Sequence, residues 1–252
     1  MSLPYTLAPQ IGTKGRIGLI VLQSDETMEA ELRQALPEDD IATFVSRIPS
    51  ASEVSNDSLA AMEADLPRAA GLLPKTVDFD VVGYGCTSAS SVIGSDRVAE
   101  MIKTGCSTAH VTNPVTALVA ACSALGISKL ALLTPYTEAV SESLRSALSA
   151  QGIETPVFGT FNEPVETKVA RIDPASIRDA AITLGKDEGA EAVFMSCTNL
   201  RTIEILKDVE AGISKPALSS NQAFFWHLMG LAGTQAKPTN SALWQVQFHE
   251  GE

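Results

Sequence analysis

Cysteine and histidine are scarce in this sequence of 252 residues, which contains four cysteines and three histidines. The cysteines stand at positions 86, 106, 122 and 197, which is too sparse for a disulfide framework, and no Cys-x-x-Cys pair occurs. The histidines are scattered along the chain, and the spacings do not favour a zinc site. We therefore expect free thiols and no metal.

Positive charge is also in short supply, because 18 Lys and Arg residues face 30 Asp and Glu residues and leave a net charge of -12. This balance argues against a nucleic-acid partner or an anionic membrane, each of which favours a basic surface. No apolar run approaches the roughly 20 residues of a membrane span. Residues 1–14 lack the layout of a signal peptide. We expect a cytoplasmic protein without nucleic-acid or membrane partners.

The sequence does contain short apolar runs that alternate with longer helical patterns, which is typical of an α/β fold. The expected strands are Arg16–Leu22, Ile41–Arg47, Phe79–Tyr84, Ala109–Thr112, Lys129–Leu133, Thr155–Gly159, Ala192–Met195 and Pro216–Ser219. The expected helices are Thr27–Ala35, Ser55–Ala70, Val92–Lys103, Pro114–Leu125, Glu138–Ala150, Pro174–Leu184, Leu200–Val209 and Gln222–Met229.

The second half of the chain repeats the plan of the first half. The helix that ends Leu-Arg-Gln-Ala-Leu from Leu32 is echoed by Leu-Arg-Ser-Ala-Leu from Leu144, at an offset of 112 residues. A strand followed by Cys86-Thr is echoed by a strand followed by Cys197-Thr, at an offset of 111 residues. A third echo pairs Asn113 with Asn221. Three matches at similar offsets indicate an internal duplication.

The duplication predicts two similar, mainly parallel α/β lobes related by a pseudo-twofold axis. We expect residues 1–113 to form the first lobe, with residues 220–252 packing back on it, and residues 114–219 to form the second lobe. Loops at the carboxyl ends of strands are the usual ligand-binding edge of α/β sheets, and Cys86 and Cys197 both follow apolar strands. The repeat therefore predicts an active site in the cleft between the lobes, with two thiols on opposite walls.

Paired thiols suit chemistry at a carbon next to a carboxylate. A thiolate can remove a proton from one face of that carbon while a thiol returns a proton to the other face, and a thiolate that adds to a double bond gives cis–trans isomerisation. Positive partial charge at a following helix start favours both the thiolate and a bound carboxylate. A lone cysteine is more often a small buried apolar residue, and we keep that interpretation for Cys106 and Cys122.

These residues resemble the Asp/Glu racemase superfamily, and more closely its branch of maleate isomerases and arylmalonate decarboxylases. The similarity extends from about Arg16 to about Met229, and its most specific parts are Tyr84-Gly-Cys-Thr-Ser, Leu133-Thr-Pro-Tyr and Met195-Ser-Cys-Thr-Asn-Leu-Arg-Thr. The resemblance implies catalysis without a cofactor. Arylmalonate decarboxylases keep only one of the two cysteines, so the presence of both here ranks a decarboxylase lower.

The resemblance also implies roles for individual residues. Cys86 and Cys197 would be the catalytic pair. Tyr136 would hydrogen-bond a substrate carboxylate, unless it is simply a partly buried aromatic residue that closes the cleft. The hydroxyls, amides and backbone N–H groups around the substrate carboxylates would come from Thr87, Ser88, Thr198 and Asn199.

Two acidic residues depart from the pattern of the maleate isomerases, which carry asparagine where this chain has Asp25 and, by a less secure alignment, Glu166. An ionised carboxylate accepts hydrogen bonds but cannot donate them, so this pair would repel a dicarboxylate and attract a cation. The sequence also resembles the branch associated with utilisation of ectoine and hydroxyectoine, which carry a carboxylate and an amidinium group. Alternatively, the two acids are helix N-cap or loop residues, an interpretation with equal support for Asp25.

The sequence thus predicts a cofactor-independent, two-cysteine isomerase or racemase for a small zwitterionic acid of the ectoine or amino-acid type. Maleate cis–trans isomerisation, decarboxylation of the arylmalonate type and binding of a small carboxylic acid without turnover remain alternatives. The tail from Gly233 to Glu252 has apolar residues suited to a partner subunit, and we expect a homodimer.

Overall fold

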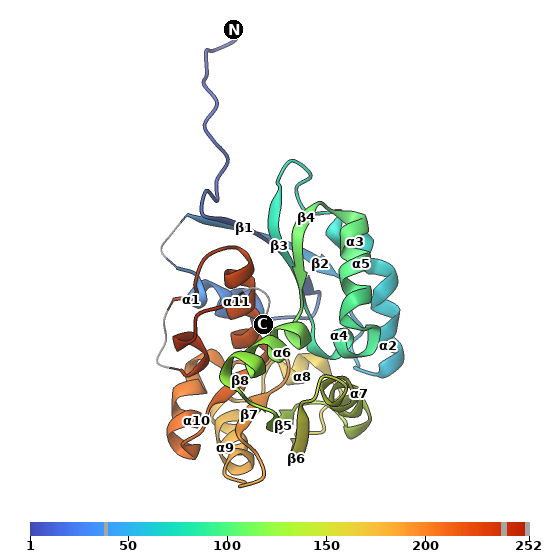
Figure 1. Ribbon diagram of the computed structural model, residues 1–252. Coiled ribbons are helices and arrows are strands. Elements are labelled where there is room, and N and C mark those ends of the chain that lie inside the picture. The colour runs from blue at the N-terminus through green and yellow to red at the C-terminus, as the bar shows by residue number, and fades with distance from the viewer. Residues whose placement is uncertain (38–39, 238–240, 250–252) are drawn as a thin grey trace.

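Eight strands form two parallel sheets of four in the computed structural model, which describes residues 1–37, 40–237 and 241–249. The first sheet lies in the upper part of Figure 1 and the second sheet in the lower part. All eight predicted strands are present. Their bounds are β1 Gly15–Leu22, β2 Ile41–Ile48, β3 Phe79–Gly85, β4 Thr108–Thr112, β5 Lys129–Thr134, β6 Glu154–Thr160, β7 Ala192–Met195 and β8 Ala217–Ser219.

The two sheets share one topology. The strand order is β2-β1-β3-β4 in the first sheet and β6-β5-β7-β8 in the second, so that each strand has its counterpart four strands later. Every pairing between neighbouring strands is parallel. The prediction of two similar, parallel α/β units is therefore confirmed. The cysteines follow the counterpart strands β3 and β7, which puts both at the carboxyl edge of a sheet.

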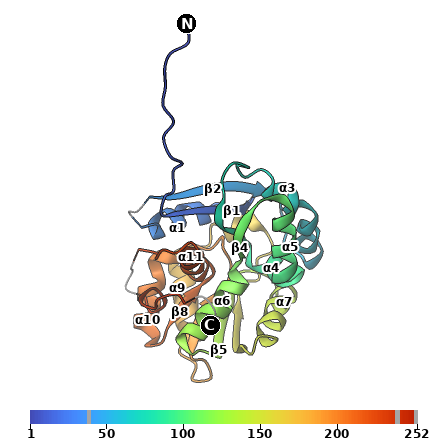
Figure 2. The same cartoon turned by 45° about the horizontal axis from the view of Figure 1, so that its top comes forward.

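Helices cover the faces of both sheets (Figures 1 and 2). They are α1 Met28–Ala35, α2 Asn56–Ala61, α3 Leu66–Ala70, α4 Thr87–Ile93, α5 Ser95–Gly105, α6 Pro114–Leu125, α7 Glu138–Ser149, α8 Glu166–Val169, α9 Pro174–Gly185, α10 Leu206–Ile213 and α11 Ser220–Leu231, with 3-10 turns η1 Met62–Asp65, η2 Ile203–Ile205 and η3 Leu243–Gln245.

Three of the predicted helices differ from those observed. The helix predicted over Ser55–Ala70 is broken by the 3-10 turn η1. The helix predicted from Val92 begins earlier, at Thr87, and is divided at Gly94, whose φ of 92° is readily adopted only by glycine. The helix predicted from Leu200 begins only at Leu206, after an irregular segment and η2. This last difference affects the site, because the irregular segment carries Cys197.

The inner strands β1, β3, β5 and β7 are largely buried on both faces, which explains their continuous apolar sequences, whereas the edge strands β2, β4 and β6 are partly exposed. Along β1, Ile17 and Leu19 belong to one hydrophobic cluster, whereas Ile20 and Leu22 belong to another. Both clusters also draw residues from the second sheet, for example Phe194 in the first cluster. The core is thus shared between the sheets, and this packing holds the facing strand ends in place.

The last long helix, α11, packs against β3, β4, α1 and α6. The predicted lobe boundaries at residues 113 and 219 stay a prediction, as does the placement of the tail, of which residues 238–240 and 250–252 lie outside the described residues. The first residues extend away from the body in Figures 1 and 2. Among the helices of the described residues, none combines the length and the apolar character that a membrane span requires.

Candidate active site

The two cysteines stand at corresponding strand ends but in different backbone settings. Cys86 is the N-cap of α4, and its Sγ accepts the backbone N–H of Ala89 at 3.4 Å. Cys197 lies two residues beyond β7 with a φ of 139°, in a segment without regular structure. Its Sγ accepts the backbone N–H of Asn199 at 3.3 Å. The helix predicted to begin near each cysteine is therefore observed at Cys86 alone.

Tyr136 connects the second thiol to a buried carboxylate. Its hydroxyl donates to Glu166 Oε2 at 2.9 Å and lies 3.1 Å from Cys197 Sγ. A tyrosine hydroxyl has one proton, so with that proton directed to Glu166 the thiol is the donor in the second contact. The predicted contact of Tyr136 with a substrate carboxylate stays a prediction, and in this structure the hydroxyl is engaged by protein groups.

Asn199 and Thr198 join the second cysteine segment to the first half of the chain. The Asn199 side chain donates to the carbonyl of Ser24 at 3.3 Å and accepts the N–H of Glu26 at 2.9 Å. The Thr198 hydroxyl donates to the carbonyl of Gly85, next to Cys86, at 3.1 Å. These bonds bring the segments that carry the two cysteines together at one place.

Glu166 and Asp25 lie in this same place, and each is less than a tenth exposed. Asp25 Oδ1 accepts the N–H groups of Thr27 and Met28 at 2.9 and 2.8 Å, which supports its interpretation as a helix-start residue. Within the described residues its other oxygen, Oδ2, accepts no hydrogen bond and neither acid forms a salt bridge. Arg47 donates to the backbone carbonyl of Asp25 at 3.1 Å rather than to its carboxylate.

Glu166 occupies the first position of α8 and is held by side chains from elsewhere in the fold. Besides the Tyr136 hydroxyl, it accepts the Asn199 amide at Oε1 at 3.0 Å. Burial raises the pKa of Glu166 above its usual value, and these two bonds oppose that effect. Burial likewise raises the pKa of Asp25 to about 6, and the negative charge of Glu166 adds to the increase. The two acids are therefore close enough to repel each other.

Both thiols are held in the protonated form by their surroundings. Burial raises the pKa of Cys86 to about 12, with the negative charges of Glu166 and Asp25 adding to the effect. Burial also raises the pKa of Cys197 well above its usual value, and Glu166 is again the charge that contributes most. Cys86 also raises the pKa of Cys197, so the thiols influence each other. Any process that neutralises Glu166 would make both thiols more acidic.

The hydroxyls predicted to surround a substrate carboxylate are partly engaged by the protein. Thr87 shares a hydrogen bond of 2.8 Å with Ser220, whose hydroxyl also accepts the N–H of Cys197 at 3.0 Å. Ser88 is buried, and its hydroxyl makes no hydrogen bond within the described residues. Sequence reasoning missed Ser220, because a serine at a helix start is common and gives no signal of contact with a distant segment.

Two chain segments pair over the site. Glu53 and Val165 form an antiparallel bridge, flanked by hydrogen bonds from Val54 N–H to the Pro164 carbonyl and from Glu166 N–H to the Ser52 carbonyl. The two cysteines are 6% and 4% exposed beneath the surface of the molecule. We expect groups near the thiols to move when a substrate enters, and the bridge is the first candidate because Val165 precedes Glu166, whose side chain meets Tyr136 beside Cys197.

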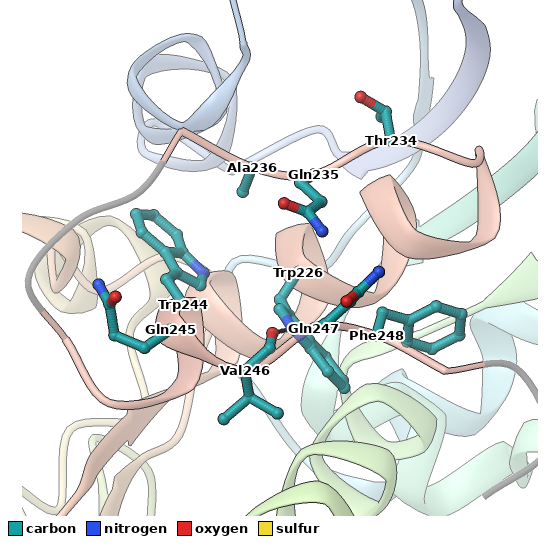
Figure 3. A pocket seen from close by; sticks show the side chains of 9 residues that line it. All are labelled: Trp226, Thr234, Gln235, Ala236, Trp244, Gln245, Val246, Gln247 and Phe248. Carbon is teal, nitrogen blue, oxygen red and sulfur yellow. Dashed lines mark hydrogen bonds between the residues drawn. The ribbon is translucent and has the colours of Figure 1, made fainter.

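A surface hollow lies elsewhere, beside the end of α11. That hollow, of about 270 Å³, is lined by Trp226, Trp244, Phe248 and neighbouring residues (Figure 3). None of its lining residues is a predicted site residue. In the part of the chain that the structure describes, no three His, Cys, Asp or Glu side chains group together as metal ligands.

Comparisons with known proteins agree with the geometry. The arylmalonate decarboxylase family matches residues 17–243. A maleate isomerase from Pseudomonas putida is 30% identical over 220 residues, which cover 81% of this chain and 86% of the relative. An arylmalonate decarboxylase from Bordetella bronchiseptica is 28% identical over 127 residues, covering 50% of this chain and 53% of the relative.

A solved structure of the Nocardia farcinica maleate cis-trans isomerase has a similar fold. It is a cysteine-to-serine mutant with a covalently bound succinylcysteine intermediate. The two structures have a TM-score of 0.79 and a sequence identity of 26%, and the match covers 88% of this chain and 94% of the other.

Proposed function

This chain belongs to the maleate isomerase and arylmalonate decarboxylase branch of the Asp/Glu racemase superfamily, and we propose that it is a two-cysteine isomerase acting on a small zwitterionic acid. The reaction takes place at a carbon next to a carboxylate and needs no cofactor. The substrate is of the ectoine, hydroxyectoine or amino-acid type.

The observation that carries the proposal is the buried pair of Asp25 and Glu166 beside the two thiols, with no salt bridge within the described residues. Two buried acids that form no ion pair are costly, and both pKa values are raised even though the nearby Arg47 charge lowers that of Asp25. A substrate ammonium or amidinium group would relieve this cost, whereas a second carboxylate, as in maleate, would add to it. The acid pair therefore favours a substrate with one positive group.

Substrate binding would also activate the thiols. Glu166 contributes more than any other charge to the raised pKa of Cys86 and of Cys197. A bound cation neutralises that charge, so the thiolate forms more readily once the substrate is present. One cysteine then takes the proton from the substrate carbon as a thiolate, and the other gives its own proton to the opposite face. The product has the opposite configuration at that carbon. The cysteine that began as a thiolate is now a thiol, and the other cysteine is now a thiolate.

Maleate cis–trans isomerisation is the second candidate, because a 30% identical relative is a maleate isomerase and a similar structure holds a succinylcysteine. That reaction would use a thiolate as nucleophile rather than as base. It requires Asp25 and Glu166 to be protonated next to a dicarboxylate, which their raised pKa values make less costly at low pH. The two candidates thus differ in substrate charge and in pH preference.

The deciding experiment incubates the protein in deuterated water with ectoine, hydroxyectoine, aspartate, diaminobutyrate, maleate and phenylmalonate. We expect deuterium to enter one carbon of a zwitterionic acid, and Cys86→Ala and Cys197→Ala each to abolish that exchange. Cys106→Ala and Cys122→Ala are matched controls and should retain it, because Cys106 follows α5 and Cys122 lies within α6, and neither is at the carboxyl end of a strand. Conversion of maleate to fumarate as the main activity would reject the zwitterionic substrate. Binding without exchange or conversion would reject the isomerase.

A further inference from the structure

A third buried carboxylate, Glu31 of α1, lies outside the group of residues used so far. Its residue is 5% exposed, on the face of α1 that packs into the core. It accepts the backbone N–H groups of Thr202 at 2.5 Å and Ile203 at 2.9 Å, and the Asn221 side-chain amide at 2.7 Å. All three donors belong to the second half of the chain. An acidic side chain of the first half is thus hydrogen-bonded to three donors of the second half.

The donors hold the segment that carries the second thiol. Thr202 and Ile203 end the irregular stretch that begins at Cys197. The Asn221 amide uses its second hydrogen to bond the carbonyl of Thr198 at 2.8 Å. Glu31 therefore restrains the segment at its far end directly and near the cysteine through Asn221.

This segment needs support from outside itself. Cys197 has a φ of 139°, which is unfavourable for a residue with a side chain, and the next five residues form no helix that would supply regular hydrogen bonds. Such a conformation persists only where surrounding groups determine it. Cys86, in contrast, is held by the helix that it caps. The two thiols of the duplicated fold are thus positioned by different means.

The support is not duplicated. The 112-residue offset of the repeat pairs Glu31 with Ser143, which is half-buried and bonds Asn56 Oδ1 at 3.3 Å. Asn113, the counterpart of Asn221, caps α6 by accepting the N–H groups of Val115 and Thr116. The pair of Glu31 and Asn221 is therefore a specialisation of one half, where the irregular cysteine segment lies.

We propose that Glu31 is a positioning residue that fixes the Cys197 segment in its reactive conformation across the boundary between the two halves. The effect on turnover rests on the proposed function, but the effect on the segment does not. Burial raises the pKa of Glu31 to about 7, while the three donors favour its ionised form. Burial of the carboxylate costs desolvation free energy, and the hydrogen bonds from Thr202, Ile203 and Asn221 offset that cost.

The test compares Glu31→Ala and Glu31→Gln with the wild-type protein and with Glu138→Gln, which removes a charge from the exposed start of α7, the counterpart of α1. Iodoacetamide alkylation of the folded proteins is followed separately at Cys197 and Cys86 by mass spectrometry. We expect Glu31→Ala to increase the ratio of the Cys197 rate to the Cys86 rate at least about fivefold, because the loosened segment exposes its thiol. Glu138→Gln should leave the ratio unchanged.

Glutamine keeps an oxygen that can accept the two backbone N–H groups but presents an amide to Asn221. Glu31→Gln should therefore give a ratio between those of the wild type and Glu31→Ala. With a substrate in hand, we expect kcat of Glu31→Ala to fall at least about tenfold and KM to change little, because thiol placement and not binding is lost.

A folded Glu31→Ala protein with the wild-type alkylation ratio would overturn the proposal, whatever its thermal stability. If Glu31→Ala does not fold, a wild-type ratio in Glu31→Gln together with unchanged kcat would do so. Should no acid of the substrate panel be turned over by the wild type, the alkylation ratio still decides the positioning role, so the two proposals fail separately.

Discussion

At the scale of single residues, Asp25 combines two roles that the sequence presents as alternatives. One carboxylate oxygen accepts two N–H groups at the start of α1, as an N-cap residue would, while the other has no protein donor within the described residues. The cap sets the orientation of the carboxylate, and Glu166 lies near enough to raise its pKa. A structural role and a role in cation binding are therefore compatible in this residue.

The double variant Asp25→Asn with Glu166→Gln should reverse the charge preference of the site. We expect KM for a zwitterionic substrate to rise at least about tenfold and maleate to bind more tightly, since amides can donate to a carboxylate. For the wild type, KM of the zwitterion should fall as pH rises through about 6, because only ionised Asp25 attracts a cation. Steady-state kinetics between pH 5 and 8 with both substrates measure this. An unchanged preference would mean that the acids do not face the substrate.

At the scale of elements, the packing of α11 on the first sheet positions two residues that hydrogen-bond the Cys197 segment. Ser220 and Asn221 stand at the start of α11 and bond the Cys197 segment. Further along, Phe224 packs directly on Gly83 of β3. A side chain at position 83 would push the helix away from the sheet and would disturb its first turn.

Gly83→Ala should destabilise the protein by about 1–3 kcal/mol, because the added Cβ would lie 2.5 Å from Phe224 Cζ. The free energy of unfolding in urea measures the change, and Cys197 alkylation should accelerate in the same variant. Gly189→Ala is the control, since there the nearest atom belongs to the exposed Asp187 side chain, which can move. Equal stability of the two variants would contradict the tight contact between α11 and β3.

At the scale of the whole molecule, we predict that access to the thiols depends on a contact between the two halves. The bridge between Glu53 and Val165 joins the segment after β2 to the segment after β6, which are counterparts in the repeat. Since the cysteines are buried, opening of this contact is the expected entry step for a substrate.

A disulfide across the bridge should close the site. Residues facing each other in an antiparallel bridge are close enough for such a bond, so we expect oxidised Glu53→Cys with Val165→Cys to lose at least about tenfold in kcat/KM and in alkylation of Cys86 and Cys197. Dithiothreitol should restore both. The single variant Glu53→Cys and the oxidised wild type are the controls. Full activity of the cross-linked protein would show that the substrate enters elsewhere.

The sequence by itself determined the duplicated α/β plan, all eight strands and the position of Cys86 and Cys197 after counterpart strands. These features depend on local patterns: apolar runs of strand length, their alternation with helices, and the recurrence of both at similar offsets. The family assignment depended on the same short motifs around the cysteines. A pattern that recurs along the chain can be recognised from the sequence alone.

Only the tertiary structure decided which groups meet between the repeats and where the symmetry fails. Glu31 looks like an ordinary helix acid in the sequence, and Ser220 like an ordinary helix-start serine, yet both support the Cys197 segment. The late start of α10 and the irregular backbone at Cys197 also escaped the sequence pattern, because they depend on hydrogen bonds from distant elements. Contacts between residues that are 23 positions apart, as for Ser220 and Cys197, or 171 positions apart, as for Glu31 and Thr202, leave no periodic signal, so the folded chain alone reveals them.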